Sequence, residues 1–141
     1  MPSRENEGEV YEFVRKRAHP NLGLALNSAR ALSDGSRPAR LRDLQGESIF
    51  HVSLMDCKNG QLWPGLGDLN LQGFVRILSR LGYVGPWSVS GQDSAANGYR
   101  ALVNILDEVA ASEPSAQFHV PQLPARVPAM GIEFIEFAVD E

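Results

Sequence analysis

Short apolar runs alternate with amphipathic segments over residues 1–111. The runs "LGLAL" (22–26), "SIFHVSLMD" (48–56) and "PWSVS" (86–90) are bounded by turn residues, which is typical of buried strands. Apolar residues then recur at helical spacing, once after the second run and once after the third. The residues expected to point inward are Leu71, Phe74, Val75, Leu78 and Leu81 in the first of these helices, and Tyr99, Leu102, Val103 and Leu106 in a helix from about 94 to 110. Strand and helix in this alternation predict parallel βα units.

Two weaker helices and one loop complete this part of the chain. Val10, Phe13 and Val14 are spaced to share one face of a helix that ends before "HPNLG". A short second helix is expected near "PARLRDL". The segment "CKNGQLWPGLGD" is rich in glycine and carries a proline, so it predicts a loop after the second strand.

The pattern changes after residue 111. The segment "SEPSAQFHVPQLPARVPAM" (112–130) holds four of the nine prolines, which neither donate to a sheet nor continue a helix. It therefore predicts an extended linker. In "GIEFIEFAVDE" (131–141) apolar residues alternate with acidic ones, as in a half-buried strand. Because this strand has no partner nearby in the sequence, we expect it to belong to a further domain.

Charge and composition exclude several classes of function. The chain has 13 Lys and Arg against 17 Asp and Glu, and this net charge of −4 gives no reason to expect a nucleic-acid partner. The polar, acidic start is unlike a signal peptide, and no run reaches the roughly 18 apolar residues of a membrane span. A single cysteine, Cys57, cannot form an internal disulfide. We therefore expect a cytoplasmic protein without a membrane partner.

Four blocks of sequence carry a more specific signal. They are "HPNLGLALNSARALSDGS", "IFHVSLMD", "PGLGDLNLQGFVRILSRLGYVGPWSVS" and "GIEFIEFAVDE", in that order. Together they resemble the bacterial 3-dehydroshikimate dehydratases of the xylose isomerase-like barrel superfamily, in many of which a 4-hydroxyphenylpyruvate dioxygenase-like domain follows the barrel. The resemblance implies an α/β fold: a partial TIM barrel of about three βα units over 1–111, a proline-rich linker over 112–130, and the first strand of the second domain over 131–141.

The resemblance also implies an activity and a cofactor. The family is a group of lyases of quinate and shikimate catabolism, on the route to protocatechuate, that use a divalent metal such as magnesium, manganese or cobalt. The metal ligands would stand at the carboxyl ends of the strands, where the βα loops converge. The metal would polarise the substrate carbonyl and stabilise an enolate while a base removes a neighbouring proton. A hard cation of this kind requires oxygen-rich, mostly anionic ligands.

This chain departs from the family at every metal position that it covers. Where the family reads Asp-Ser-Phe-His, this chain reads "NSAR", so Asn27 replaces a ligand and Arg30 replaces the catalytic His. Ser53 stands at the position of a Gln ligand and Ser90 at that of a Glu ligand, and a further Glu would lie upstream of the first residue. The His and Arg that hold the substrate are also absent from the loop, where only Lys58 offers a cation. We therefore expect no metal cofactor and no intact catalytic residue, and the substrate-binding residues stay undefined.

Other residues near the strand ends have both a chemical and a structural interpretation. His51 shares a face with Ser53 and could serve as a substitute ligand, but a packed or hydrogen-bonded histidine is the preferred interpretation. Asp56 could act as a base, although loop capping is commoner. Cys57 has no histidine beside it to support a nucleophilic role. Trp63 is interpreted as a cover of the barrel top rather than as a substrate lid.

Three functions follow from these observations. The first is a truncated, non-catalytic relative of the dehydratases. The second is an active dehydratase or sugar isomerase-like enzyme half that another chain completes, and the third is an interaction module that binds an anion through Arg30. A barrel of three units leaves two open sheet edges, which invite pairing with another chain. We therefore expect self-association or a complementary barrel half as the partner.

Overall fold

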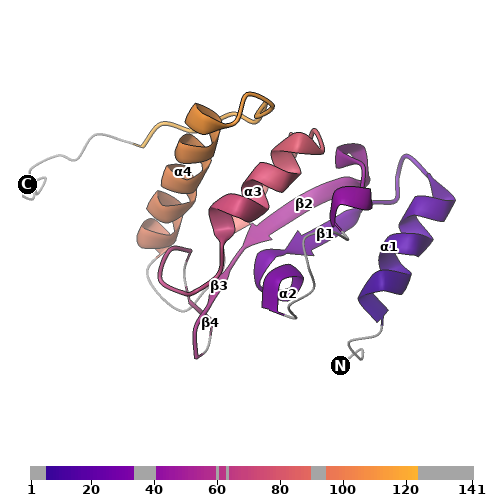
Figure 1. Ribbon diagram of the computed structural model, residues 1–141, viewed down its shortest axis with the longest axis horizontal. Helices are drawn as coiled ribbons and strands as arrows, with labels where there is room; N and C mark the ends of the chain where they lie inside the picture. The colour runs from indigo at the N-terminus through magenta and orange to yellow at the C-terminus, as the bar shows by residue number, and fades with distance from the viewer. Residues whose placement is uncertain (1–5, 34–40, 60, 63, 90–94, 124–141) are drawn as a thin grey trace, which may run out of the picture.

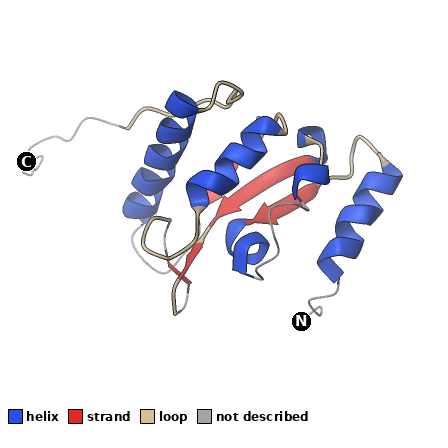
Figure 2. Ribbon diagram, viewed as in Figure 1, coloured by secondary structure: helices blue, strands red, loops and turns tan. Residues whose placement is uncertain are grey.

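A parallel three-stranded sheet forms the centre of the protein. The computed structural model describes residues 6–33, 41–59, 61–62, 64–89 and 95–123. The strands β1 (Leu24–Asn27), β2 (Ile49–Leu54) and β5 (Trp87–Val89) lie in the order β1-β2-β5. Figure 2 shows the strands in red and the helices in blue. All three strands predicted from the apolar runs are thus confirmed, and the fold class is α/β with parallel strands.

The helices form a layer against the sheet. Figure 1 shows α3 (Leu71–Arg80) and α4 (Ala95–Ser112) side by side, with α1 (Asn6–Arg17) at the opposite end of the layer. The short α2 (Ser28–Ser33) follows β1 directly, and a two-stranded antiparallel pair, β3 (Asp56–Cys57) and β4 (Gln61–Leu62), opens the loop after β2. The order of the central elements is that of consecutive βα units.

One predicted helix is not α-helical over its described part, residues 41–44. Near "PARLRDL" the structure has a 3₁₀ turn, Leu41–Asp43, and a second 3₁₀ turn covers Gly46–Ser48. The two apolar residues of this segment, Leu41 and Leu44, are both buried. Their spacing of three residues suits the 3₁₀ repeat, and two anchors are too few to hold a longer amphipathic helix on the core.

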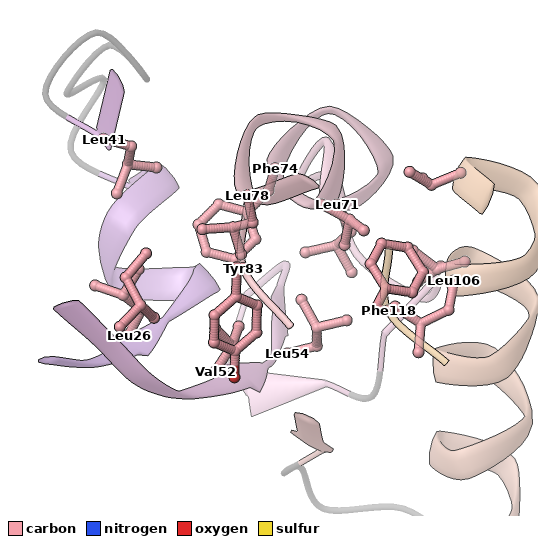
Figure 3. Close-up of a cluster of buried hydrophobic side chains, with 14 of the residues drawn as sticks. Leu26, Leu41, Val52, Leu54, Leu71, Phe74, Leu78, Tyr83, Leu106 and Phe118 are labelled. Carbon is pink, nitrogen blue, oxygen red and sulfur yellow. The ribbon is translucent and has the colours of Figure 1, made fainter. Parts of the chain in front are cut away.

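The hydrophobic core lies between the sheet and the helix layer. Figure 3 shows Val52 and Leu54 of β2 facing Phe74 and Leu78 of α3, and all four are at most 1% exposed. Leu106 of α4 closes the cluster from the side. The helical stripe predicted for α3 is therefore confirmed, because these apolar positions face the sheet.

Helix α3 has well-defined ends. The Asn70 side-chain oxygen accepts a hydrogen bond from the Gly73 N–H at 2.9 Å, which caps the first turn. At the other end Gly82 has a φ of +79°, and the N–H of Tyr83 reaches back to the Leu78 carbonyl at 3.0 Å. This is a Schellman motif, and its left-handed position favours glycine. These caps fix where the chain enters and leaves the helix.

Three large apolar side chains of α1 and α4 lie outside the core, and one of them, Tyr99, was predicted to point inward. Val10 and Phe13 of α1 are 49% and 51% exposed, and Tyr99 of α4 is 39% exposed. Only Val14 of the α1 stripe is buried. Helical spacing places side chains on one face, but a neighbouring element must cover that face, and none of the described elements covers these three.

The residues just after α4 pack on the fold. The Phe118 side chain is only 8% exposed, and its ring lies 5.7 Å from that of Trp87 in an edge-to-face arrangement. The Arg80 guanidinium pairs with the Glu113 carboxylate at 2.9 Å. The first part of the predicted linker therefore contacts the core. The rest of that linker and the predicted terminal strand lie outside the described residues.

We expect the Glu113 contact to weaken at low pH. The Ser115 hydroxyl, and then the Arg80 guanidinium, hold the pKa of the Glu113 carboxyl below its ordinary value of 4.5. A lowered pKa in the folded state stabilises the fold above the unfolded-state pKa, and this contribution disappears as the pH falls through the folded-state pKa. Urea unfolding of the wild type and Glu113→Gln should thus differ at neutral pH and converge well below pH 4.5. A difference that persists there would contradict the assignment.

Candidate functional site

The strand ends bring three of the polar residues into one row. Asn27 of β1 is the register partner of Ser53 of β2, and Ser53 is in turn the partner of Ser88 of β5. Side chains alternate along a strand, and Leu26, Val52 and Leu54 face the helices. Asn27, Ser53 and Ser88 therefore form a row on the face of the sheet that points away from the helices. Ser90, the third predicted ligand position, lies outside the described residues.

The Asn27 side chain is engaged by its own backbone. Its Oδ1 atom accepts hydrogen bonds from the N–H groups of Ala29 at 3.0 Å and Arg30 at 3.2 Å. This is the arrangement of an N-cap, and it starts α2 immediately after β1. The carbonyl oxygen, which is the one metal-donor atom of the amide, thus has two backbone donors already.

Ser28 joins the ends of two neighbouring strands. Its hydroxyl, which is fully buried, lies 2.7 Å from both the carbonyl oxygen and the N–H of Met55. The hydroxyl donates to the first and accepts from the second. Sequence reasoning did not single out this residue, because the partner is 27 positions away and nothing local indicates it.

Asp56 holds the loop after β2. Its carboxylate is 1% exposed and accepts four backbone N–H groups at 2.8 to 3.1 Å. The donors are Cys57, Gly65, Gly67 and Leu69. Loop capping, the commoner interpretation of this aspartate, is confirmed. A carboxylate with this many donors and no access to solvent is not placed to remove a proton from a substrate.

The other candidates do not converge on one point. Lys58 pairs with Asp68 at 3.4 Å on the exposed side of the loop. Cys57 and His51 are half-buried. The register partner of His51 on β1 is Ala25, which has no polar side chain. Trp63 lies outside the described residues. Within the described ranges no group of three or more His, Cys, Asp or Glu side chains is close enough together to hold a metal ion.

The donor set at the strand ends does not fit a divalent cation. It consists of one amide oxygen, already bonded to two N–H groups, and the hydroxyls of Ser53 and Ser88. All of these are neutral, whereas hard divalent cations select carboxylate oxygens. Arg30 follows Asn27 by three residues and carries a permanent positive charge. This row can accept or donate hydrogen bonds, but it offers no anionic ligand.

No protein-family model matches the chain. Among curated proteins, it is 30% identical to a 3-dehydroshikimate dehydratase of Pseudomonas putida and 31% identical to one of Pseudomonas aeruginosa. Each match covers 94% of this chain but 25% of the relative. An inosose isomerase of Halalkalibacterium halodurans is 30% identical over 58% of this chain and 32% of that protein. The chain thus spans about a quarter of the length of the dehydratases it matches.

Two solved structures share the fold. One is a xylose isomerase-like TIM barrel/4-hydroxyphenylpyruvate dioxygenase fusion protein, with a TM-score of 0.68, 25% identity, and coverage of 84% of this chain and 23% of that one. The other is the IOLI protein with a zinc atom, with a TM-score of 0.60, 22% identity, and coverage of 73% and 42%. Both likenesses agree with the parallel α/β fold described above. No helix among the described residues is long and apolar enough to cross a bilayer.

Proposed function

We propose that this chain is a non-catalytic relative of the 3-dehydroshikimate dehydratases, a stretch of barrel whose strand ends do not hold a metal. The observation that carries the proposal is the hydrogen bonding of the Asn27 side chain. Asn27 stands at the end of β1, where the resemblance places an aspartate ligand, and its side-chain oxygen caps α2. A side chain used as a helix cap is not available to a metal without loss of that cap.

Electrostatics support the same conclusion. Relative to the family pattern, Asn27 removes one negative charge and Ser90 another, while Arg30 adds a positive charge. Two unit charges 4 Å apart interact by about 4 kcal/mol at the effective dielectric constant of a protein surface. The loss of two carboxylates that would attract the cation, together with repulsion of the cation by Arg30, therefore outweighs the binding energy that neutral hydroxyl ligands supply. One substitution could be compensated, but the combination could not.

A direct test is manganese binding by the purified full chain. We expect no saturable binding of Mn²⁺ in the micromolar range by calorimetry, and no turnover of 3-dehydroshikimate in its presence. Asn27→Ala is the matched variant, and it should give the same flat titration as the wild type. The positive control restores the family pattern with Asn27→Asp, Arg30→His, Ser53→Gln and Ser90→Glu, and its affinity should rise at least about tenfold, or 1.4 kcal/mol.

Two results would overturn the proposal. One is saturable Mn²⁺ binding by the wild type that Asn27→Ala removes, because Asn27 would then be a ligand. The other is turnover of 3-dehydroshikimate that chelation abolishes. Either result would favour the alternative of an active enzyme part that another chain completes.

A further inference from the structure

A groove of about 440 Å³ lies between helix α4 and the loop that follows β2. The loop forms one wall with Pro64 and Leu66, and a stripe of α4 between Asn97 and Glu108 forms the other. Volumes of this order are usual for small-molecule sites. The groove is on the helix side of the sheet, whereas the polar row at the strand ends lies on the opposite face. It is therefore separate from the site described above.

Both walls of this groove are held in place by hydrogen bonds. The buried Asp56 carboxylate accepts the Gly65 N–H at 3.1 Å, which fixes the loop wall. Helices α3 and α4 lie side by side (Figure 1), and the Gln72 side-chain amide donates to the Glu108 carboxylate at 3.3 Å between them. A ligand that enters a groove with fixed walls pays little for ordering them.

The α4 wall carries a cation with amide groups on both sides of it. Arg100 is half-buried, and Asn97 and Asn104 lie three residues before and four residues after it, so the three side chains share one face of the helix. A guanidinium is always charged, and its N–H groups match a carboxylate in a bidentate pair. Within the described ranges, no hydrogen bond or ion pair engages the Arg100 side chain. The acidic Glu108 lies about 12 Å further along the helix axis and already accepts a bond from Gln72.

The remaining surface of the groove is apolar. Ala101 and Ile105 of α4 line it beside Arg100, and Ile105 is 5% exposed. From the loop wall Leu66 is 56% exposed, next to the buried Pro64. Covering such surface contributes about 25 cal/mol for each Å² that is removed from water. The groove thus combines one cationic group with apolar walls.

We propose that this groove binds a small organic carboxylate with an apolar chain. The carboxylate accepts hydrogen bonds from Arg100, and the chain lies between Leu66 and Ala101. An organic amine of the same shape is repelled by the guanidinium, and inorganic phosphate leaves the apolar walls exposed to water. Because the groove shares no residue with the polar row at the strand ends, this inference is independent of the metal-binding test.

Amide NMR spectra of the isotopically labelled full chain test the proposal, with hexanoate as the probe. We expect saturable shifts of the amide signals of Gly65, Leu66 and Ala101, and no such shifts with hexylamine or inorganic phosphate at the same ionic strength. Arg100→Gln should raise the Kd for hexanoate at least about tenfold, as the loss of a charged hydrogen bond predicts. The matched control is Arg42→Gln, which removes the same charge from an exposed position outside the groove and should leave the Kd unchanged.

Two further variants separate the two parts of the site. Arg100→Lys keeps the charge but loses the bidentate pair, so its Kd for hexanoate should lie between those of the wild type and Arg100→Gln. Leu66→Ser should weaken hexanoate binding through the apolar wall, and the amide spectrum of each variant shows whether it is folded. A wild type whose groove signals do not move with hexanoate overturns the proposal. So does inorganic phosphate that binds the groove as tightly as hexanoate, or a Kd that Arg100→Gln leaves unchanged.

Discussion

Asp56→Asn should lower the free energy of unfolding by about 3 kcal/mol, although the side chain keeps its size. The amide replaces one of two oxygens that together accept four backbone N–H groups in a site 1% exposed. Its NH₂ group then faces the N–H groups of Gly65 and Gly67, or those of Cys57 and Leu69 after a flip. In either case two buried donors lose their acceptor. Urea unfolding followed by tryptophan fluorescence measures the effect.

The control for this experiment lies in the same loop. Asp68→Asn removes a carboxylate that is 69% exposed and pairs with Lys58 at 3.4 Å. Exposed ion pairs contribute about 0 to 1 kcal/mol, so this variant should unfold almost like the wild type. Equal effects of the two substitutions would mean that the loop does not depend on the buried carboxylate. The loop conformation would then need another explanation.

Leu106→Ala should destabilise the protein by about 3 kcal/mol, since the leucine is 1% exposed and closes the core cluster. Tyr99 lies on the same helix and was expected to be equally buried. It is 39% exposed, so Tyr99→Ala should cost about 1 kcal/mol or less. Both variants place alanine in the same helix, and leucine and tyrosine differ in helix propensity by only a few tenths of a kcal/mol, so the comparison reports mainly on burial. Thermal and urea unfolding of both check the ranking.

The opposite order of the two stability losses would indicate a different environment for α4. If Tyr99→Ala proved the more damaging, another element would have to cover the N-terminal half of α4 in solution. The exposed face of α4 would then belong to an interface. A small effect of Leu106→Ala would indicate that the core relaxes around the cavity more than a close-packed interior usually does.

The elements of the fold could be predicted because their signals are local. Apolar runs bounded by turn residues located β1, β2 and β5, and helical spacing located α3 and α4. The resemblance of the four sequence blocks gave the barrel class, which the parallel register and the two solved structures support. Near Leu41 the described part of the predicted helix is a 3₁₀ turn, because a short segment with two apolar anchors fits such a turn equally well.

The sequence indicated that Asn27 and Ser53 stand at neighbouring strand ends, but not how these ends are hydrogen-bonded. The residue types at Asn27, Arg30 and Ser53 already indicated a lack of anionic ligands. That the Asn27 oxygen caps α2 depends on how the chain turns at the strand end. Ser28 was overlooked because its partner, Met55, belongs to another strand end.

The sequence by itself determined which segments become strands and helices and which charges the strand ends carry, because both follow from residue type and local spacing. Only the tertiary structure decided that Asp56 is a buried acceptor of four N–H groups and that Val10, Phe13 and Tyr99 lie outside the core. Burial and hydrogen bonding depend on which distant segments lie beside a residue in space. Periodicity along the chain carries no information about those neighbours.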